Sequence, residues 1–236
     1  MVVFRRQPVQ YPSLMVPDLS HLTATDTAYL SALHIYLGDD APVTLTARGD
    51  LSILHNQRHH PLFALFCSIQ CPPTLILQTY ELAQALRDAG VTVISGFHSP
   101  MEKECLSILL KGTQPVILCP ARSLGTLHIR PDWKVALEHG RLLLLSPFTE
   151  EERRPTTDRA KERNALVAAL ADIVFVAHAA PGGKTERFCK DVLTWKKPVL
   201  TLDSQENAHL FSLGINIVRP EQIGKQGELF VIDEEE

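Results

Sequence analysis

The chain of 236 residues lacks the features that would place it in a membrane or an oxidising compartment. It contains no run of about 18 consecutive apolar residues, the minimum for a membrane-spanning helix. Near its start, Pro8, Pro12 and Pro17 stand where a secretory signal would carry an apolar stretch. The five cysteines are an odd number without Cys-x-x-Cys spacing, which predicts reduced thiols rather than disulfides or a zinc site. We therefore expect a cytoplasmic protein without a membrane or a metal.

An excess of positive charge is also missing. The formal net charge of −4 argues against a protein that coats nucleic acid indiscriminately. One stretch directly after Glu150, Glu151 and Glu152 is nevertheless rich in basic side chains. It contains Arg153, Arg154, Arg159, Lys161 and Arg163. This stretch is either a solvated helix face or part of an anion-binding surface, and the sequence leaves both open.

Short apolar segments alternate with helical patterns through the middle of the chain. The predicted strands are Leu62–Cys67, Val91–Ser95, Pro115–Cys119, Arg141–Ser146, Asp172–Ala177 and Val199–Leu202. The predicted helices are Thr74–Ala89, Met101–Leu110, Asp132–His139, Arg159–Ala171 and Thr185–Trp195. Such alternation predicts an α/β fold, a doubly wound, mostly parallel Rossmann-like sheet with helices on both faces.

The outer parts of the chain give weaker signals. Residues 1–40 form a predicted N-terminal extension with a short helix over Tyr29–Leu37. Residues 41–220 form the predicted Rossmann-like domain, and residues 221–236 an acidic C-terminal tail. Two further short strands are predicted within Phe211–Val218 and Glu228–Ile232.

The most informative segment joins the strand Asp172–Ala177 to the next helix through Pro181-Gly182-Gly183. Glycine lets the backbone approach an anion closely, and a helix N-terminus aims unpaired N–H groups at it. Ligands of parallel α/β sheets bind beyond the carboxyl ends of the strands, where other small and polar residues collect. We therefore predict a phosphate-binding or nucleic-acid-binding site formed by Ser68, Ser95, Gly96, Arg163, Asn164, Gly182, Gly183, Lys184 and Thr185.

Two other interpretations of this segment remain open. Pro-Gly-Gly can be a tight strand-to-helix connection without a ligand. His178–Thr185 also has the spacing of a P-loop with histidine in place of the first glycine, although a P-loop normally opens its domain. His98 follows a glycine turn without a paired acid, so we assign it no catalytic role. We predict no catalytic residue and no cofactor.

Several motifs follow one another in a characteristic order. They are Pro42–Leu51 with Arg48-Gly49-Asp50, then Val93–Gly96, Leu145-Ser146-Pro147, Arg163-Asn164 and Ala171–Val176. In this order they resemble the core of the DNA-processing protein A (DprA, also Smf) family, over roughly residues 40–203. The resemblance implies a Rossmann-like protein that binds single-stranded DNA, forms a homodimer and loads the recombinase RecA during natural transformation, without being a conventional enzyme.

Some positions differ from the family's motifs. Its Gly-Ser-Arg after the first core strand is here Cys67-Ser68-Ile69, which removes an arginine expected to face DNA. The Pro-Gly-Gly turn also resembles that of the LONELY GUY (lysine-decarboxylase-like) phosphoribohydrolases, whose motif Pro-Gly-Gly-x-Gly-Thr-x-x-Glu ends in a catalytic carboxylate. Cys189 occupies the position of that glutamate, and Glu186 could replace it only after a local shift. A nucleotide-binding protein or phosphoribohydrolase of this type is the alternative function.

Overall fold

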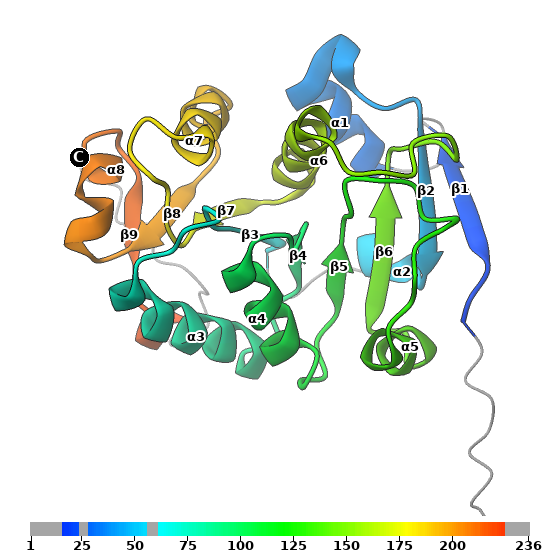
Figure 1. Ribbon diagram of the computed structural model, residues 1–236, viewed down its shortest axis with the longest axis horizontal. Coiled ribbons are helices and arrows are strands. Elements are labelled where there is room, and N and C mark those ends of the chain that lie inside the picture. The colour runs from blue at the N-terminus through cyan, green and yellow to red at the C-terminus, as the bar shows by residue number, and fades with distance from the viewer. Residues whose placement is uncertain (1–15, 24–27, 56–60, 225–236) are drawn as a thin grey trace, which may run out of the picture.

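A nine-stranded sheet forms the centre of the protein (Figure 1). The computed structural model describes residues 16–23, 28–55 and 61–224. Within these residues the strands lie in the order β1-β2-β6-β5-β4-β3-β7-β8-β9. Their bounds are β1 (Leu19–Thr23), β2 (Thr44–Gly49), β3 (Phe63–Phe66), β4 (Val93–Ser95), β5 (Val116–Leu118), β6 (Leu142–Ser146), β7 (Ile173–Val176), β8 (Val199–Leu202) and β9 (Asn216–Val218).

From β6 to β9 every pair of neighbouring strands is parallel. At the centre, β3 and β7 pair with Phe63 opposite Ile173 and Phe66 opposite Val176. Only the pairs that β2 makes with β1 and β6 are antiparallel in the described part of the chain. The predicted α/β class with a mostly parallel sheet is therefore confirmed.

Helices cover both faces of this sheet, as predicted (Figure 1). α1, α6, α7 and α8 lie on one face, and α3, α4 and α5 lie on the other. Their bounds are α1 (Ala28–Leu37), α2 (Ser52–His55), α3 (Pro73–Asp88), α4 (Pro100–Leu109), α5 (Pro131–Glu138), α6 (Thr157–Leu170), α7 (Lys184–Thr194) and α8 (Ala208–Phe211). Short 3-10 turns occur at η1 (Gly38–Asp40), η2 (Gln205–Asn207) and η3 (Pro220–Gln222).

The strand β3 shows why its sequence is apolar throughout. Phe63 and Leu65 pack in the core cluster beneath α3 and α4, whereas Ala64 and Phe66 pack in the cluster on the opposite face. Successive side chains of a strand point to opposite faces, and here both faces are covered by helices. An uninterrupted apolar run is thus the expected pattern for a central parallel strand.

The sheet extends further toward the N-terminus than the sequence analysis predicted. β1 and β2 pair with Leu19 opposite Arg48, and β2 then pairs with β6 with Thr46 opposite Ser146. The sequence analysis predicts no strand in either segment. The reason is visible in β1, where Leu22 is the one buried residue, so no apolar alternation marks the strand.

The last strand is shorter than predicted. Phe211 ends α8, and β9 begins only at Asn216. The left-handed Gly214, with φ +81°, separates the two elements. The predicted strand Glu228–Ile232 lies outside the described residues.

Candidate phosphate or nucleic-acid site

The connections of the sheet diverge at β3. From β3 the chain passes through α3 to β4 on one side, whereas α6 carries the chain from β6 to β7 on the other side. The loops that follow β3 and β7 begin at Cys67 and Ala177. At such a switch point the loops lead away from each other, which is where open α/β sheets bind their ligands. The predicted site contains residues from both loops.

Ser68 joins the two loops. Its backbone N–H donates to the carbonyl oxygen of His178 at 2.9 Å. Its hydroxyl donates to Thr185 Oγ1 at 3.0 Å and accepts from the N–H of Ala180 at 3.1 Å. The structure therefore brings Ser68 and Thr185 into direct contact, although 117 positions separate them in the chain.

The Pro-Gly-Gly turn has the backbone geometry that the sequence suggested. Gly182 has φ +68°, in the left-handed region that favours glycine. A side chain on Gly183 would come within 2.7 Å of the carbonyl oxygen of Ala180. Lys184 and Thr185 open α7, and the first N–H groups of a helix have no partner inside it. These amides and the exposed Lys184 suit an anionic ligand.

Glu186 stabilises this turn from within. Its carboxylate accepts a hydrogen bond from the N–H of Gly182 at 2.7 Å and forms an ion pair with Lys190. His209 Nε2 lies 3.9 Å from the same carboxylate. The bond from Lys190 is the main cause that lowers the pKa of Glu186, which keeps the group ionised. This arrangement suits a structural anion better than a group that must gain a proton.

His178, at the first position of the P-loop spacing, is buried rather than open to a ligand. Its Nδ1 lies 3.0 Å from Asn207 Oδ1. The amide of Asn207 donates in turn to the carbonyl of Ala177 and to Thr201 Oγ1. This buried network joins the ends of β7 and β8 and gives His178 a packing role.

A second group of predicted site residues surrounds Arg163. Its Nη1 donates to the carbonyl of Cys119 at 2.9 Å, and its Nε donates to Asn164 Oδ1 at 2.8 Å. The guanidinium occupies the space beside Gly96, because an added Cβ there would lie 1.3 Å from Nη1. Burial is the main cause that lowers the pKa of Arg163, which is only 4% exposed. Arg163 therefore ties α6 to the carboxyl ends of β4 and β5.

Ser95 forms its hydrogen bonds at the same edge of the sheet. Its hydroxyl donates to the carbonyl of Leu65 at 2.6 Å and accepts from the N–H of Phe97 at 3.1 Å. Phe97 has φ +44°, a strained conformation for a residue other than glycine. Ser95 thus fixes the turn in which Gly96 makes room for the guanidinium.

Glu102 connects the two groups and was missed by the sequence analysis. Its Oε1 accepts from the N–H of Cys67 at 2.9 Å, and its Oε2 accepts from the N–H of His98 at 2.6 Å. With Ser99 it forms a capping box at the start of α4. The Ser-x-x-Glu spacing was the available signal, and only the contact with Cys67 required the folded structure.

Some side chains of the basic stretch form contacts within the protein. Arg159 pairs with Glu152 at 3.1 Å and also donates to the carbonyl of Arg154. Arg154 and Lys161 are exposed. The segment 150–163 carries as many carboxylates as basic side chains, so any attraction for phosphates comes from the exposed cations rather than from its net charge.

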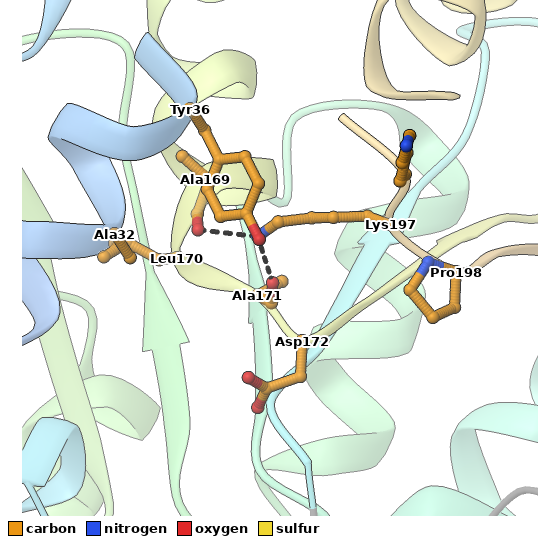
Figure 2. Close-up of a pocket in the computed structure, with 9 residues that line it drawn as sticks. Ala32, Tyr36, Ala169, Leu170, Ala171, Asp172, Lys197 and Pro198 are labelled. Carbon is orange, nitrogen blue, oxygen red and sulfur yellow. Dashed lines mark hydrogen bonds between the residues drawn. The ribbon is translucent and has the colours of Figure 1, made fainter. Parts of the chain in front are cut away.

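A cavity of about 260 Å³ lies at the amino end of β7 and β8, away from the predicted site. Figure 2 shows Lys197 reaching across it toward Tyr36. The ammonium lies 3.9 Å from the centre of the Tyr36 ring and donates to the carbonyls of Ala168, Ala169 and Ala171. These contacts use all three ammonium protons. Lys197 therefore caps the C-terminal end of α6.

In the parts of the chain that the structure describes, no group of three or more His, Cys, Asp or Glu residues could hold a metal ion. No helix among the same residues is long and apolar enough to cross a bilayer.

The sheet, its switch point and the glycine turn define a Rossmann-like α/β protein with a glycine-containing strand-to-helix connection after β7. The profile of the DNA recombination-mediator protein A family matches residues 20–214. The chain therefore belongs to this family, which confirms the resemblance seen in the sequence. No curated protein sequence matches the chain.

Solved structures of similar fold include two members of this family. DNA processing protein A (DprA) from Streptococcus pneumoniae aligns with a TM-score of 0.69 and 20% identity, over 85% of this chain and 71% of that chain. The Helicobacter pylori protein, studied for its single-stranded DNA binding mode, aligns with a TM-score of 0.68 and 21% identity, over 84% and 90%. A molybdenum cofactor binding protein from Rippkaea orientalis aligns with a TM-score of 0.50 and 17% identity, over 70% and 93%. These matches confirm the Rossmann-like fold.

Proposed function

We propose that this protein binds single-stranded DNA along the carboxyl edge of its sheet and acts as a recombination mediator. The observation that carries the proposal is the junction at Ser68, whose bonds to Ala180 and Thr185 hold the β3 loop against the glycine turn. Membership of the recombination-mediator family and the DNA-binding mode described for the Helicobacter protein support the same ligand.

Within this proposal the predicted site residues have two kinds of role. Lys184, Thr185 and the first backbone N–H groups of α7 contact phosphate oxygens, because the N–H groups of Gly182 and Gly183 are already bonded to Glu186 and Ala180. Gly96, Arg163 and Asn164 position the neighbouring edge of the sheet, because the guanidinium is buried beside Gly96. Ile69 is 70% exposed where the family's motif has an arginine, so we expect weaker phosphate binding at this loop.

We further propose that the protein works in the cytoplasm, forms a homodimer and delivers single strands to RecA. These expectations come with the family, and RecA-dependent strand exchange on protein-coated DNA tests the last of them. Gel filtration with light scattering tests the homodimer.

A nucleotide hydrolase of the LONELY GUY type is the alternative. It is favoured by the Pro-Gly-Gly turn alone. Against it, the buried Cys189 stands where that motif needs a glutamate, and Glu186 is ionised and bonded to Gly182 and Lys190. A single closed pocket with a free carboxylate is what such an enzyme requires.

Parallel titrations of oligo-dT, AMP and ATP separate the two functions, with release of free base followed in the same samples. We expect the oligonucleotide to bind much more tightly than either mononucleotide, because several phosphates contribute, and no base to be released. The hydrolase would be established instead by absent oligonucleotide binding at low salt together with base release that Glu186→Gln abolishes.

A further inference from the structure

The loop that follows β3 and the start of α3 form an uncharged surface beside the glycine turn. The chain carries no charged side chain from Pro61 to Tyr80. α3 and α7 lie on opposite faces of the sheet, so their first turns flank the junction at Ser68 from two sides (Figure 1). On the α7 side, Lys184 and Arg187 are exposed. The proposed ligand site therefore has one cationic side and one uncharged side.

The uncharged side also has few groups that could donate to a phosphate. Pro72 is the N-cap of α3 and Pro73 its first residue, and proline has no backbone N–H. The N–H of Leu75 is bonded to the carbonyl oxygen of Pro72. A helix normally offers its first N–H groups to an anion, and the two prolines and this bond reduce that capacity at α3. Phosphate groups therefore find their donors on the α7 side.

Ile69 presents an apolar side chain on the uncharged side, and this side chain is 70% exposed. The backbone next to it is held in place, because Ser68 bonds to Ala180 and Thr185. Leu77, on the second turn of α3, is 65% exposed and adds a second apolar side chain. Apolar side chains held in water beside cations suit a ligand that is apolar in one part and anionic in another. A nucleotide strand has this composition, with apolar base faces on a chain of phosphates.

We propose that Ile69 contacts the face of a nucleobase of the bound strand, while the sugar-phosphate backbone runs along the α7 side. This inference rests on the proposed function, since it assigns one contact within the same ligand site. Proteins that unstack or bind single bases pack apolar side chains, isoleucine among them, against the base faces. In a duplex these faces are covered by the neighbouring bases. Ile69 therefore favours single strands, whereas an arginine at this position would attract the phosphates of either form.

Two oligonucleotides with the same number of phosphates test the contact. One is oligo-dT, and the other is an abasic strand of equal length whose sugars carry no base. The wild-type protein should bind oligo-dT more tightly, and Ile69→Ala should weaken only that binding, by about fivefold. This loss corresponds to roughly 40 Å² of apolar surface that the base no longer covers. The slope of log K against log salt should stay the same, because the substitution removes no charge.

Two further variants sharpen the result. Ile35→Ala makes the same change at a side chain that is 74% exposed on α1, whose Ala32 and Tyr36 line the cavity at the amino end of β7 and β8. This control should bind both strands as the wild type does. Ile69→Arg should bind the abasic strand more tightly than the wild type and steepen the salt slope by about 0.7, because it adds one phosphate contact.

Failure of this inference differs from failure of the proposed function. Wild-type protein that binds both strands equally, or an affinity ratio that Ile69→Ala leaves unchanged, would overturn the base contact and leave DNA binding in place. Wild-type protein that binds neither strand at low salt would overturn both. Each variant is titrated with both strands from one preparation, so the ratio reports the contact even if the substitution lowers the stability of the protein.

Discussion

At the scale of single residues, buried polar groups explain why the carboxyl edge of this sheet needs particular side chains. Arg163 is used to hold β4, β5 and α6 together, with Gly96 providing the space. Small and polar residue types at strand ends were visible in the sequence, and so was the arginine. The burial of its guanidinium was not visible in the sequence, because it depends on how α6 packs over strands that are distant in the chain.

Replacing Gly96 by alanine should therefore destabilise the protein through Arg163. The new methyl group displaces the guanidinium, whose bonds to Cys119 and Asn164 are then lost in a buried place. We expect a loss of about 2–4 kcal/mol in the free energy of unfolding, measured by urea denaturation. In an Arg163→Ala background the same change should cost less than about 1 kcal/mol. Equal losses in both backgrounds would show that the two residues do not interact.

At the scale of elements, the strands and helices from β3 to β8 were predicted to within a few residues, because apolar runs and glycine or proline breaks mark them. β1 and β2 were not predicted. β1 is an edge strand with one buried residue and shows no apolar alternation, and in β2 the alternation is limited to Leu45 and Ala47. The capping of α6 by Lys197 could not be predicted from the sequence either. The lysine follows α7 in the sequence, and only the parallel packing of β7 and β8 brings it to the end of α6.

Lys197 gives the protein a stability that depends on pH. Burial lowers the pKa of Lys197 to about 8, against 10.5 when exposed. Between these values the unfolded chain binds more protons than the folded chain, so the contribution of this group to stability rises with pH. Below pH 8 the folded protein bears the full penalty of the buried charge. The rise from about pH 8 to 10.5 should reach up to about 3 kcal/mol.

Urea unfolding of wild type and Lys197→Met across this pH range measures the effect. The free-energy difference between the two proteins should grow with pH in favour of the wild type. Lys196→Met removes the exposed neighbouring charge and is the control for the loss of one lysine. Parallel profiles for wild type and Lys197→Met would show that Lys197 titrates alike in both states.

At the scale of the whole molecule, an acidic protein has to attract an acidic ligand. The net charge of −4 opposes a strand of phosphates, so binding depends on a few exposed cations at one edge. Those on the loops and helix starts at the carboxyl edge include Arg153, Arg154, Lys161, Lys184 and Arg187. These basic residues can be identified from the sequence alone. Only the parallel pairing of the strands shows that the connections after β6 and β7 begin at the same edge.

The salt dependence of oligo-dT binding should report this small number of cations. Each neutralised phosphate contributes about −0.7 to the slope of log K against log salt for a single strand, so these five cations together contribute at most about −3.5. Lys184→Ala and Arg154→Ala should each lower the affinity and flatten the slope by about 0.7. Lys111→Ala removes the same charge from the connection after α4, at the opposite edge, and should change neither quantity. A slope that all three variants leave unchanged would mean that the strand runs over another surface, because a phosphate contact cannot be removed without releasing fewer counterions.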